Sequence, residues 1–223
     1  MLACLLGTAH GGILTGTFQV SNDADSGIST NKVYTHLLDF GSATSTNVVI
    51  NHVAFSPAGA SGNVGPYSWL TNIPVDSAQN TNTGVDPASG LHALLSDFRH
   101  NANPGRLELA GLRPGQSYEV LLYYRQWAAP FNRNHVNRFN PGGISSEIAI
   151  DADATNAAYY VAYQYTTVSD DQGDGLRMRV DFIRGPGNQG GTYHLYGATN
   201  EEIDGEVIDP RPLQAVLTAD NHF

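Results

Sequence analysis

The residues best suited to hold a ligand lie at the end of one long predicted strand and in the loop after it. The alternating segment Tyr118–Trp127 puts Tyr123, Arg125 and Trp127 on one face, because successive side chains of a strand point to opposite faces. Sugar rings stack on flat aromatic side chains, and arginine can donate hydrogen bonds to their hydroxyls. The loop Ala128–Gly143 follows directly. The predicted ligand-binding residues of this carbohydrate-binding surface are Tyr123, Arg125, Trp127, Arg133, His135 and Arg138.

The same residues leave two other arrangements open. In the first, Tyr123 and Trp127 pack beneath the loop and Arg125 pairs with an acidic side chain. In the second, the surface is the active site of a polysaccharide lyase. Such an enzyme needs arginine to neutralise a uronate and tyrosine or histidine to take its proton. Tyr123, Arg125, Arg133 and His135 supply those residue types.

Other enzyme classes have weaker support. Glycoside hydrolysis needs two facing carboxylates. Glu119 and Glu147 could supply them, but no sequence pattern assigns them that role. The chain contains no serine elbow, Walker loop or dinucleotide-binding fingerprint, which are the motifs of hydrolase and nucleotide chemistry. We therefore expect a non-catalytic protein.

Three acidic clusters could bind calcium, which takes six to eight oxygen ligands. Asp23 and Asp25 are the predicted ligands, and Asp151–Asp153 and Asp170–Asp174 are weaker candidates. None has the twelve-residue EF-hand pattern, and aspartates in such turns also bond their own backbone. The eight histidines show no zinc-site spacing. His36, which lies within a predicted strand, fits a hydrogen-bonded core or edge residue.

The composition fits one large all-β domain. The chain has 223 residues, 41% of them hydrophobic, which is enough to pack a core. Its 21 acidic residues face 11 basic ones, for a formal net charge of −10. Nucleic acids and anionic membranes need a basic surface, so the charge argues against both and permits neutral sugars, cations or basic partners. No run reaches the ~18 apolar residues of a transmembrane helix. Abundant Asn, Gly, Thr and Ser are typical of a secreted or cell-surface bacterial protein.

Apolar alternation with a period of two recurs along the chain between clusters of Gly, Pro, Asn and Asp, as in β-sandwiches and jelly rolls. Asp86–Phe98 differs, since its apolar residues recur every three or four positions; it predicts a short helix at one end of the sandwich. The irregular segments are Ser56–Gly65, Pro74–Val85 and Ala128–Gly143. The predicted strands are Ile13–Val20, Val33–Phe40, Asn47–Phe55, Ser68–Asn72, Arg106–Ala110, Tyr118–Trp127, Ser145–Ile150, Ala157–Thr166, Leu176–Ile183 and Tyr193–Thr199.

The ends of the chain suggest a second function. Residues 1–20 fit the remnant of a signal peptide or an ordinary first strand, residues 21–203 the sandwich, and residues 204–223 a tail that docks on it or on a neighbour. Gly12–Val20 and Leu213–Ala219 could pair with the next subunit through main-chain hydrogen bonds. The alternative function is thus a self-assembling homo-oligomer, as in an extracellular fibre or surface layer. With a single cysteine, the chain cannot form an internal disulfide.

A resemblance spans roughly residues 20–203. It is carried by Asp23–Ile28, Tyr34–Gly41, Val49–Phe55, Leu109–Tyr118, Tyr123–Trp127 and His194–Asn200. These segments resemble the secreted jelly-roll domains of planctomycete and verrucomicrobial surface proteins, which are similar in architecture to galactose-binding-like and malectin-like sandwiches. Many such sandwiches bind carbohydrate. The resemblance therefore implies a fold and an extracellular setting, and it assigns no site residue.

The sequence as a whole predicts a jelly-roll-type antiparallel β-sandwich with one short helix. Its predicted function is extracellular carbohydrate binding without catalysis. A self-assembling structural subunit is the alternative, and a glycan-cleaving enzyme comes third.

Overall fold

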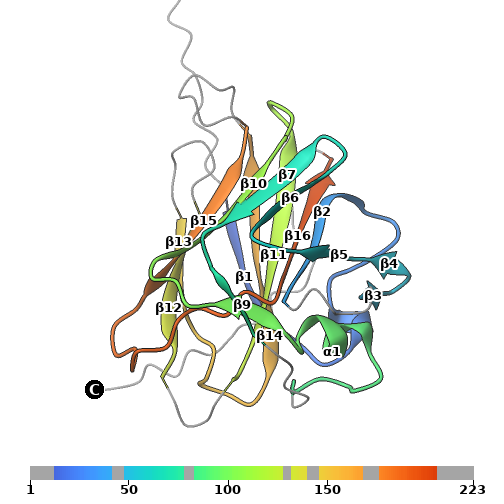
Figure 1. Ribbon diagram of the computed structural model, residues 1–223. Helices are drawn as coiled ribbons and strands as arrows, with labels where there is room; N and C mark the ends of the chain where they lie inside the picture. Colours follow the sequence, from blue (N-terminus) through green and yellow to red (C-terminus); the bar gives the residue numbers. More distant parts are fainter. Residues whose placement is uncertain are drawn as a thin grey trace, which may run out of the picture.

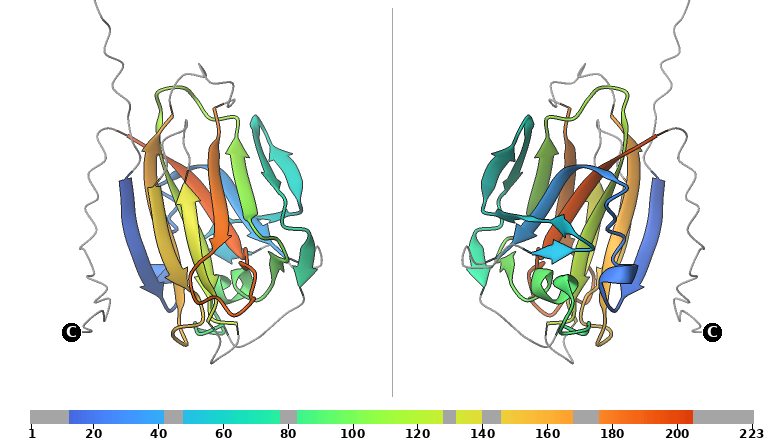
Figure 2. Two further views of the ribbon diagram at one scale, coloured as in Figure 1. Left: turned by 90° about the vertical axis from the view of Figure 1, so that its left-hand side faces the viewer. Right: turned by 90° about the vertical axis from the view of Figure 1, so that its right-hand side faces the viewer.

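Two six-stranded sheets stack face to face in this protein (Figure 1; Figure 2). The computed structural model describes residues 13–41, 48–77, 83–127, 132–139, 146–167 and 176–204. From edge to edge, the first sheet contains β1 (Ile13–Val20), β14 (Ala158–Thr166), β11 (Ser117–Arg125), β16 (Gly197–Ile203), β2 (Val33–Phe40) and β5 (Ser56–Ala58). The second contains β13 (Ser146–Asp151), β12 (Asn134–Phe139), β15 (Met178–Arg184), β10 (Gly105–Ala110), β7 (Tyr67–Thr71) and β6 (Ser61–Val64).

Smaller elements close the ends and sides of the sandwich. One two-stranded sheet pairs β3 with β4, and another pairs β8 with β9. Within the described ranges, every strand pair is antiparallel except β2 with β5, which is parallel. The fold is therefore the predicted all-β sandwich. The bounds of the small elements are β3 (Val49–Ile50), β4 (Val53–Ala54), β8 (Val75–Ser77), β9 (Phe98–His100), the 3-10 helix η1 (Asp23–Asp25) and α1 (Gly90–Leu94).

The core lies between the two sheets and includes one face of β11. Val120 on β11 pairs with Tyr163 on β14, so their side chains share a face. Phe139 of the second sheet stacks on Tyr163 with ring centroids 4.4 Å apart. That face of β11, which also carries Tyr118, Leu122 and Tyr124, is buried. In the sequence, these four residues form the more uniformly apolar of the two alternating faces, which predicts that they face the core. The prediction is confirmed.

The opposite face of β11 is also covered. The Tyr123 hydroxyl donates a 2.7 Å hydrogen bond to the carbonyl of Ser26, just after η1. A Cβ added at the neighbouring Gly27 would lie 3.0 Å from Leu121 Cδ1. A Cβ on Gly197 of β16 would lie 2.7 Å from Leu94 of α1. The segment around η1 and helix α1 therefore cover the outside of the first sheet here, and β11 is buried on both faces.

Several predicted elements need correction. The helix predicted over Asp86–Phe98 is only Gly90–Leu94, and Phe98 already begins β9. Part of the predicted loop Ala128–Gly143 is strand β12. The prediction missed β12 because its inward positions include the polar His135 and Asn137, which hide the apolar alternation. Residues 128–131 and 140–143 lie outside the described residues.

Turns and edges account for the other differences. The strand predicted over Asn47–Phe55 is the β3–β4 hairpin, because Asn51 and His52 adopt the left-handed conformation with φ of 48° and 67°. The strand predicted over Tyr193–Thr199 lies later, at β16. Short edge strands β5 and β6 occupy the predicted loop Ser56–Gly65, where apolar alternation is weak.

The described N-terminal strand lies in the chain's own sheet. Strand β1 pairs antiparallel with β14: Ile13 is opposite Gln164 at one end, and Val20 is opposite Ala158 at the other. The other segment proposed for strand donation, Leu213–Ala219, lies outside the described residues, so self-assembly through the termini stays a prediction. None of the helices in the described ranges is long and apolar enough to cross a membrane.

Candidate functional site

The aromatic end of β11 lies in the interior. The prediction that the Tyr123, Arg125 and Trp127 face is open to ligands is wrong, because Tyr123 and Arg125 are fully buried and Trp127 is half-buried. The sequence predicted the alternation of β11, but the segments that cover its outer face are far away in the chain. Tyr123 points toward Ser26 and does not line the cavity at the end of this strand.

Arg125 is held by main-chain carbonyls and aromatic rings. Its Nε donates to the Leu95 carbonyl at 2.6 Å, and Nη1 donates to the Gln126 carbonyl at 2.6 Å. The guanidinium lies 5.4 Å from the ring centroid of Trp127 and 5.2 Å from that of Tyr196, within cation–π range. Desolvation lowers the pKa of Arg125. The residue therefore joins α1, β11 and the segment before β16.

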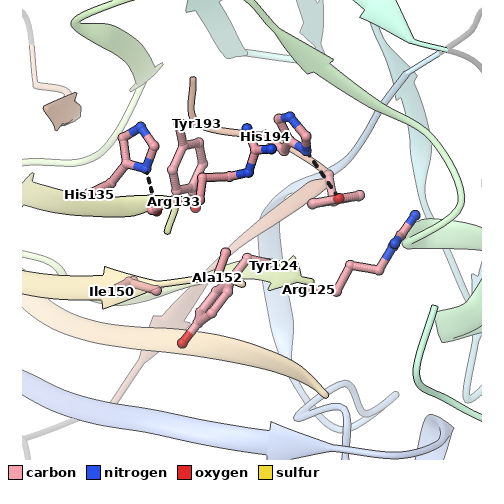
Figure 3. Close-up of a pocket in the computed structure, with 9 residues that line it drawn as sticks. Tyr124, Arg125, Arg133, His135, Ile150, Ala152, Tyr193 and His194 are labelled. Carbon is pink, nitrogen blue, oxygen red and sulfur yellow. Dashed lines mark hydrogen bonds between the residues drawn. The ribbon is translucent and has the colours of Figure 1, made fainter. Parts of the chain in front are cut away.

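The start of β12 brings Arg133 and His135 to the same end of the sandwich (Figure 3). Arg133 Nε lies 3.2 Å from the carboxylate of Asp153, and Nη1 donates to the Thr192 carbonyl at 2.9 Å. The His135 Nδ1 lies 2.8 Å from the Arg133 carbonyl. Burial, aided by the nearby Arg133 charge, lowers the pKa of His135 to about 4. His135 is therefore a neutral ring at pH 7.

His194 completes this arginine–histidine cluster, which we define as Arg125, Arg133, His135 and His194. Its ring stacks on Phe98 with centroids 4.0 Å apart, and it meets Trp127 edge-on at 5.4 Å. Burial and the neighbouring arginines hold the pKa of His194 well below its usual range. No sequence pattern predicts a site role for His194, although the residue lies in His194–Asn200, one of the segments that carry the resemblance.

The cluster encloses too little space for a sugar. Its cavity has about 10 Å³ of free volume, which is room for about one water molecule. Arg138, the last residue of the predicted set, is not part of the cluster. It points away from the core and pairs with Glu147 on β13. The cluster therefore stabilises one end of the sandwich, and the described residues around it leave no room for a glycan.

The residues proposed for other chemistry lie apart. Glu119 is on β11 of the first sheet, and Glu147 is on β13 of the second. Asp23 accepts hydrogen bonds from the amides of Gly90 and Leu91 at 3.0 and 2.8 Å and so ties η1 to α1. Asp25 accepts from the amide of Ser21 and from that of Asn22, and so closes its own turn. Calcium at Asp23 and Asp25 stays a prediction. In the described ranges, no three His, Cys, Asp or Glu side chains are placed to hold a metal ion together.

A larger pocket lies at the side of the sandwich, where the β2–β5 edge of the first sheet faces the β6–β7 edge of the second. Its volume is about 170 Å³. We call it the tryptophan pocket, after Trp69 of β7. The side chains of all its lining residues are uncharged at neutral pH. They are Tyr34, Thr35, His36, Leu37, Leu38, Ala54, Ser56, Val64 and Trp69.

Two contacts hold Trp69 in the wall of this pocket. The indole Nε1 donates to the Gly59 carbonyl at 3.3 Å. The ring also packs directly on Gly62, where an added Cβ would lie 2.3 Å from Cζ2. Only glycine leaves room for the indole at this position on β6. The local sequence therefore fixes the ring by a hydrogen bond and by close packing.

His36 forms part of the opposite wall, on β2. Its Nε2 lies 3.0 Å from the Ser68 carbonyl and its Nδ1 lies 3.0 Å from the Thr35 hydroxyl. Burial lowers the pKa of His36 to about 4, so the ring is neutral at pH 7. The expectation of a hydrogen-bonded histidine in a strand is confirmed. Trp69 is not among the ligand-binding residues predicted from the sequence. The available signal was that Trp69 is one of only two tryptophans and lies in the short alternating strand Ser68–Asn72.

The comparisons with known proteins give a fold likeness only. No family model and no curated protein matches the chain. The solved structures that resemble it include a Bacteroides uniformis beta-glucuronidase 2 covalently bound to cyclophellitol-6-carboxylate aziridine and a Bacteroides uniformis beta-glucuronidase. The first is 17% identical with a TM-score of 0.48, and the second 16% identical with a TM-score of 0.48. The matches cover 78% and 75% of this chain but only 19% and 18% of theirs. The planctomycete and verrucomicrobial family named above stays a prediction.

Proposed function

We propose that this β-sandwich binds a neutral carbohydrate in the tryptophan pocket, without catalysis and outside the cell. The observation that carries the proposal is the pocket itself: about 170 Å³ between two sheet edges, with an indole in its wall. A cavity of about 150 Å³ takes up benzene, so this pocket has room for about one six-membered ring. The proposal keeps the ligand class predicted from the sequence and moves the site from β11 to β2 and β7.

The chemistry of the walls fits a sugar. An aromatic ring carries negative charge on its face and attracts polarised C–H groups, and Trp69 supplies such a ring. The polar residues Thr35 and Ser56 line the pocket beside the apolar Leu38 and Val64. A few polar groups in an otherwise apolar concave site are typical of small-molecule pockets.

The charge pattern favours a neutral sugar over a uronate. Among the described residues, no charged side chain lines the pocket, and the chain carries a formal net charge of −10. An acidic sugar would bring a carboxylate toward this negative protein with no arginine or lysine in the pocket to pair with it, and an unpaired charge is costly to bury.

A glycan array with matched variants tests the proposal. We expect the wild type to be retained on neutral oligosaccharides. Replacing Trp69 by alanine should reduce affinity at least about tenfold, which corresponds to about 1.4 kcal/mol of lost contact. The Ala54→Tyr variant should do the same by filling the mouth of the pocket, at little cost in stability because Ala54 is exposed.

The control is Leu70→Ala, which removes an exposed side chain next to Trp69 on the same strand. It should bind like the wild type. Retention of no glycan by the wild type, or unchanged binding by both Trp69→Ala and Ala54→Tyr, would rule out this site. Assaying the array hits for cleavage products tests the non-catalytic part of the proposal, since released sugar would contradict it.

A further inference from the structure

A pair of buried glutamates lies on the outer face of the first sheet. Glu119 on β11 is directly opposite Glu201 on β16, and on its other side it is opposite Gln164 on β14. The three side chains form one row across three neighbouring strands. Like charges directly opposite each other on two strands destabilise the pairing, so the two carboxyls need another source of stabilisation.

Burial strengthens the repulsion between the two carboxyls. Glu119 is 3% exposed, Glu201 4% and Gln164 6%. Solvent therefore screens the two carboxyls poorly. When two carboxyls share a buried site, one of them binds its proton much more tightly than usual.

In the described part of the chain, one positive charge faces the two acids. The Nζ of Lys32, the only lysine of the chain, lies 2.7 Å from Glu201 Oε1. Gln164 Nε2 donates to Glu119 Oε2 at 2.7 Å. With a single proton on the pair, the one remaining negative charge balances Lys32. Without that proton, one negative charge is left in excess in a buried site.

The other titratable groups on this face do not change the balance near pH 7. Tyr34 lies opposite Glu201 on β2, and Tyr123 is four residues from Glu119 on β11. Desolvation is the main cause that raises the pKa of both tyrosines, so they stay neutral. Desolvation also raises the pKa of Glu201 to about 7; the Lys32 charge opposes this shift and Glu119 adds to it.

We propose that Glu119 and Glu201 form a proton-dependent lock between β11 and β16. One proton shared by the two carboxyls removes their mutual repulsion and holds the strands together. Its release leaves two adjacent buried anions. Because β16 also pairs with β2, the release weakens the attachment of the β16–β2–β5 side of the first sheet. The lock is inferred without reference to the proposed carbohydrate site, although Tyr34, which is opposite Glu201, also lines the tryptophan pocket.

The direction of the pH effect follows from linkage. Glu201 binds its proton more tightly in the folded chain than in the unfolded chain, so its stabilising contribution is complete at low pH and is lost as pH rises toward and through about 7. The experiment is a series of thermal unfolding curves from pH 6 to 8.5. We expect the unfolding midpoint of the wild type to fall by about 3 °C more than that of Glu201→Gln between pH 6 and 8.

Two variants separate proton binding from simple packing. Lys32→Met removes the counter-charge, so the fall of the midpoint should move to higher pH. Glu147→Gln removes a carboxylate that lies on the other sheet and pairs with Arg138, and it should keep the wild-type pH profile. A Glu201→Gln profile parallel to that of the wild type would overturn the proposal.

A measurement on the wild type removes any dependence on the folding of these variants. The carboxyl carbons of all glutamates can be followed by NMR during a pH titration. We expect the pair to release a proton near neutral pH, well above the usual range for glutamate. Titration of every glutamate below about pH 5.5 would overturn the lock even if Glu201→Gln did not fold.

Discussion

Replacing Arg125 by alanine is expected to lower the free energy of unfolding by about 3 kcal/mol or more. The change leaves the buried carbonyl of Leu95 and the part-buried carbonyl of Gln126 without this donor, and an unsatisfied buried group costs about 1–3 kcal/mol. It also removes the cation that lies beside Trp127 and Tyr196. Urea denaturation followed by circular dichroism measures the effect.

The control for this prediction is Arg138→Ala. Arg138 belonged to the same predicted ligand set but lies in an exposed ion pair with Glu147, and such pairs contribute at most about 1 kcal/mol. We therefore expect Arg138→Ala to stay close to the wild type. Equal stability of the Arg125→Ala and Arg138→Ala variants would contradict the interior role of the arginine–histidine cluster.

Acidification from pH 7 to 4 is expected to destabilise the protein strongly, because its buried histidines must gain charge. Burial lowers the pKa of His36 and of His135 from the usual 6.5 to about 4. Between these values the unfolded chain binds more protons than the folded chain. Stability that is complete above about pH 6.5 is therefore lost as the pH falls toward 4. At 1.36 kcal/mol per pKa unit, each histidine contributes about 3 kcal/mol.

The carboxyl pair acts in the opposite direction over part of this range, since protonation stabilises Glu201. The histidine effect prevails because two residues contribute to it, and His194 adds a third. Urea unfolding at pH 7, 6, 5 and 4 measures the sum. His36→Gln and His135→Gln should each flatten the pH dependence. Constant stability from pH 7 to 4 would contradict the neutral burial of these rings.

The sequence predicts the fold well where side-chain alternation is regular. The bounds of β1 and β2 agree with the predicted Ile13–Val20 and Val33–Phe40. It fails at β12, because polar side chains such as Asn137 point inward there. Alternation reports which residues share a face, but it cannot report what covers that face.

That limit explains the error at the candidate site. The inward face of β11 was predicted correctly, whereas its outer face is covered by Ser26, Gly27 and the α1 region, which are far away in the chain. The tryptophan pocket was missed for a related reason. It exists only because the edge with His36 faces the edge with Trp69, and no local pattern shows which two sheet edges lie opposite each other.

Tryptophan fluorescence can show whether a sugar binds beside Trp69, because the chain has only two tryptophans, Trp69 and Trp127. The Trp127→Phe variant leaves Trp69 as the only emitter, and Trp69→Phe leaves Trp127. Each is titrated with the neutral oligosaccharide that the wild type retains best on the array. We predict a saturable change in the emission of the Trp127→Phe variant and none at the same concentrations in Trp69→Phe. A response that appears only in Trp69→Phe would contradict the account and place the ligand at the end of β11.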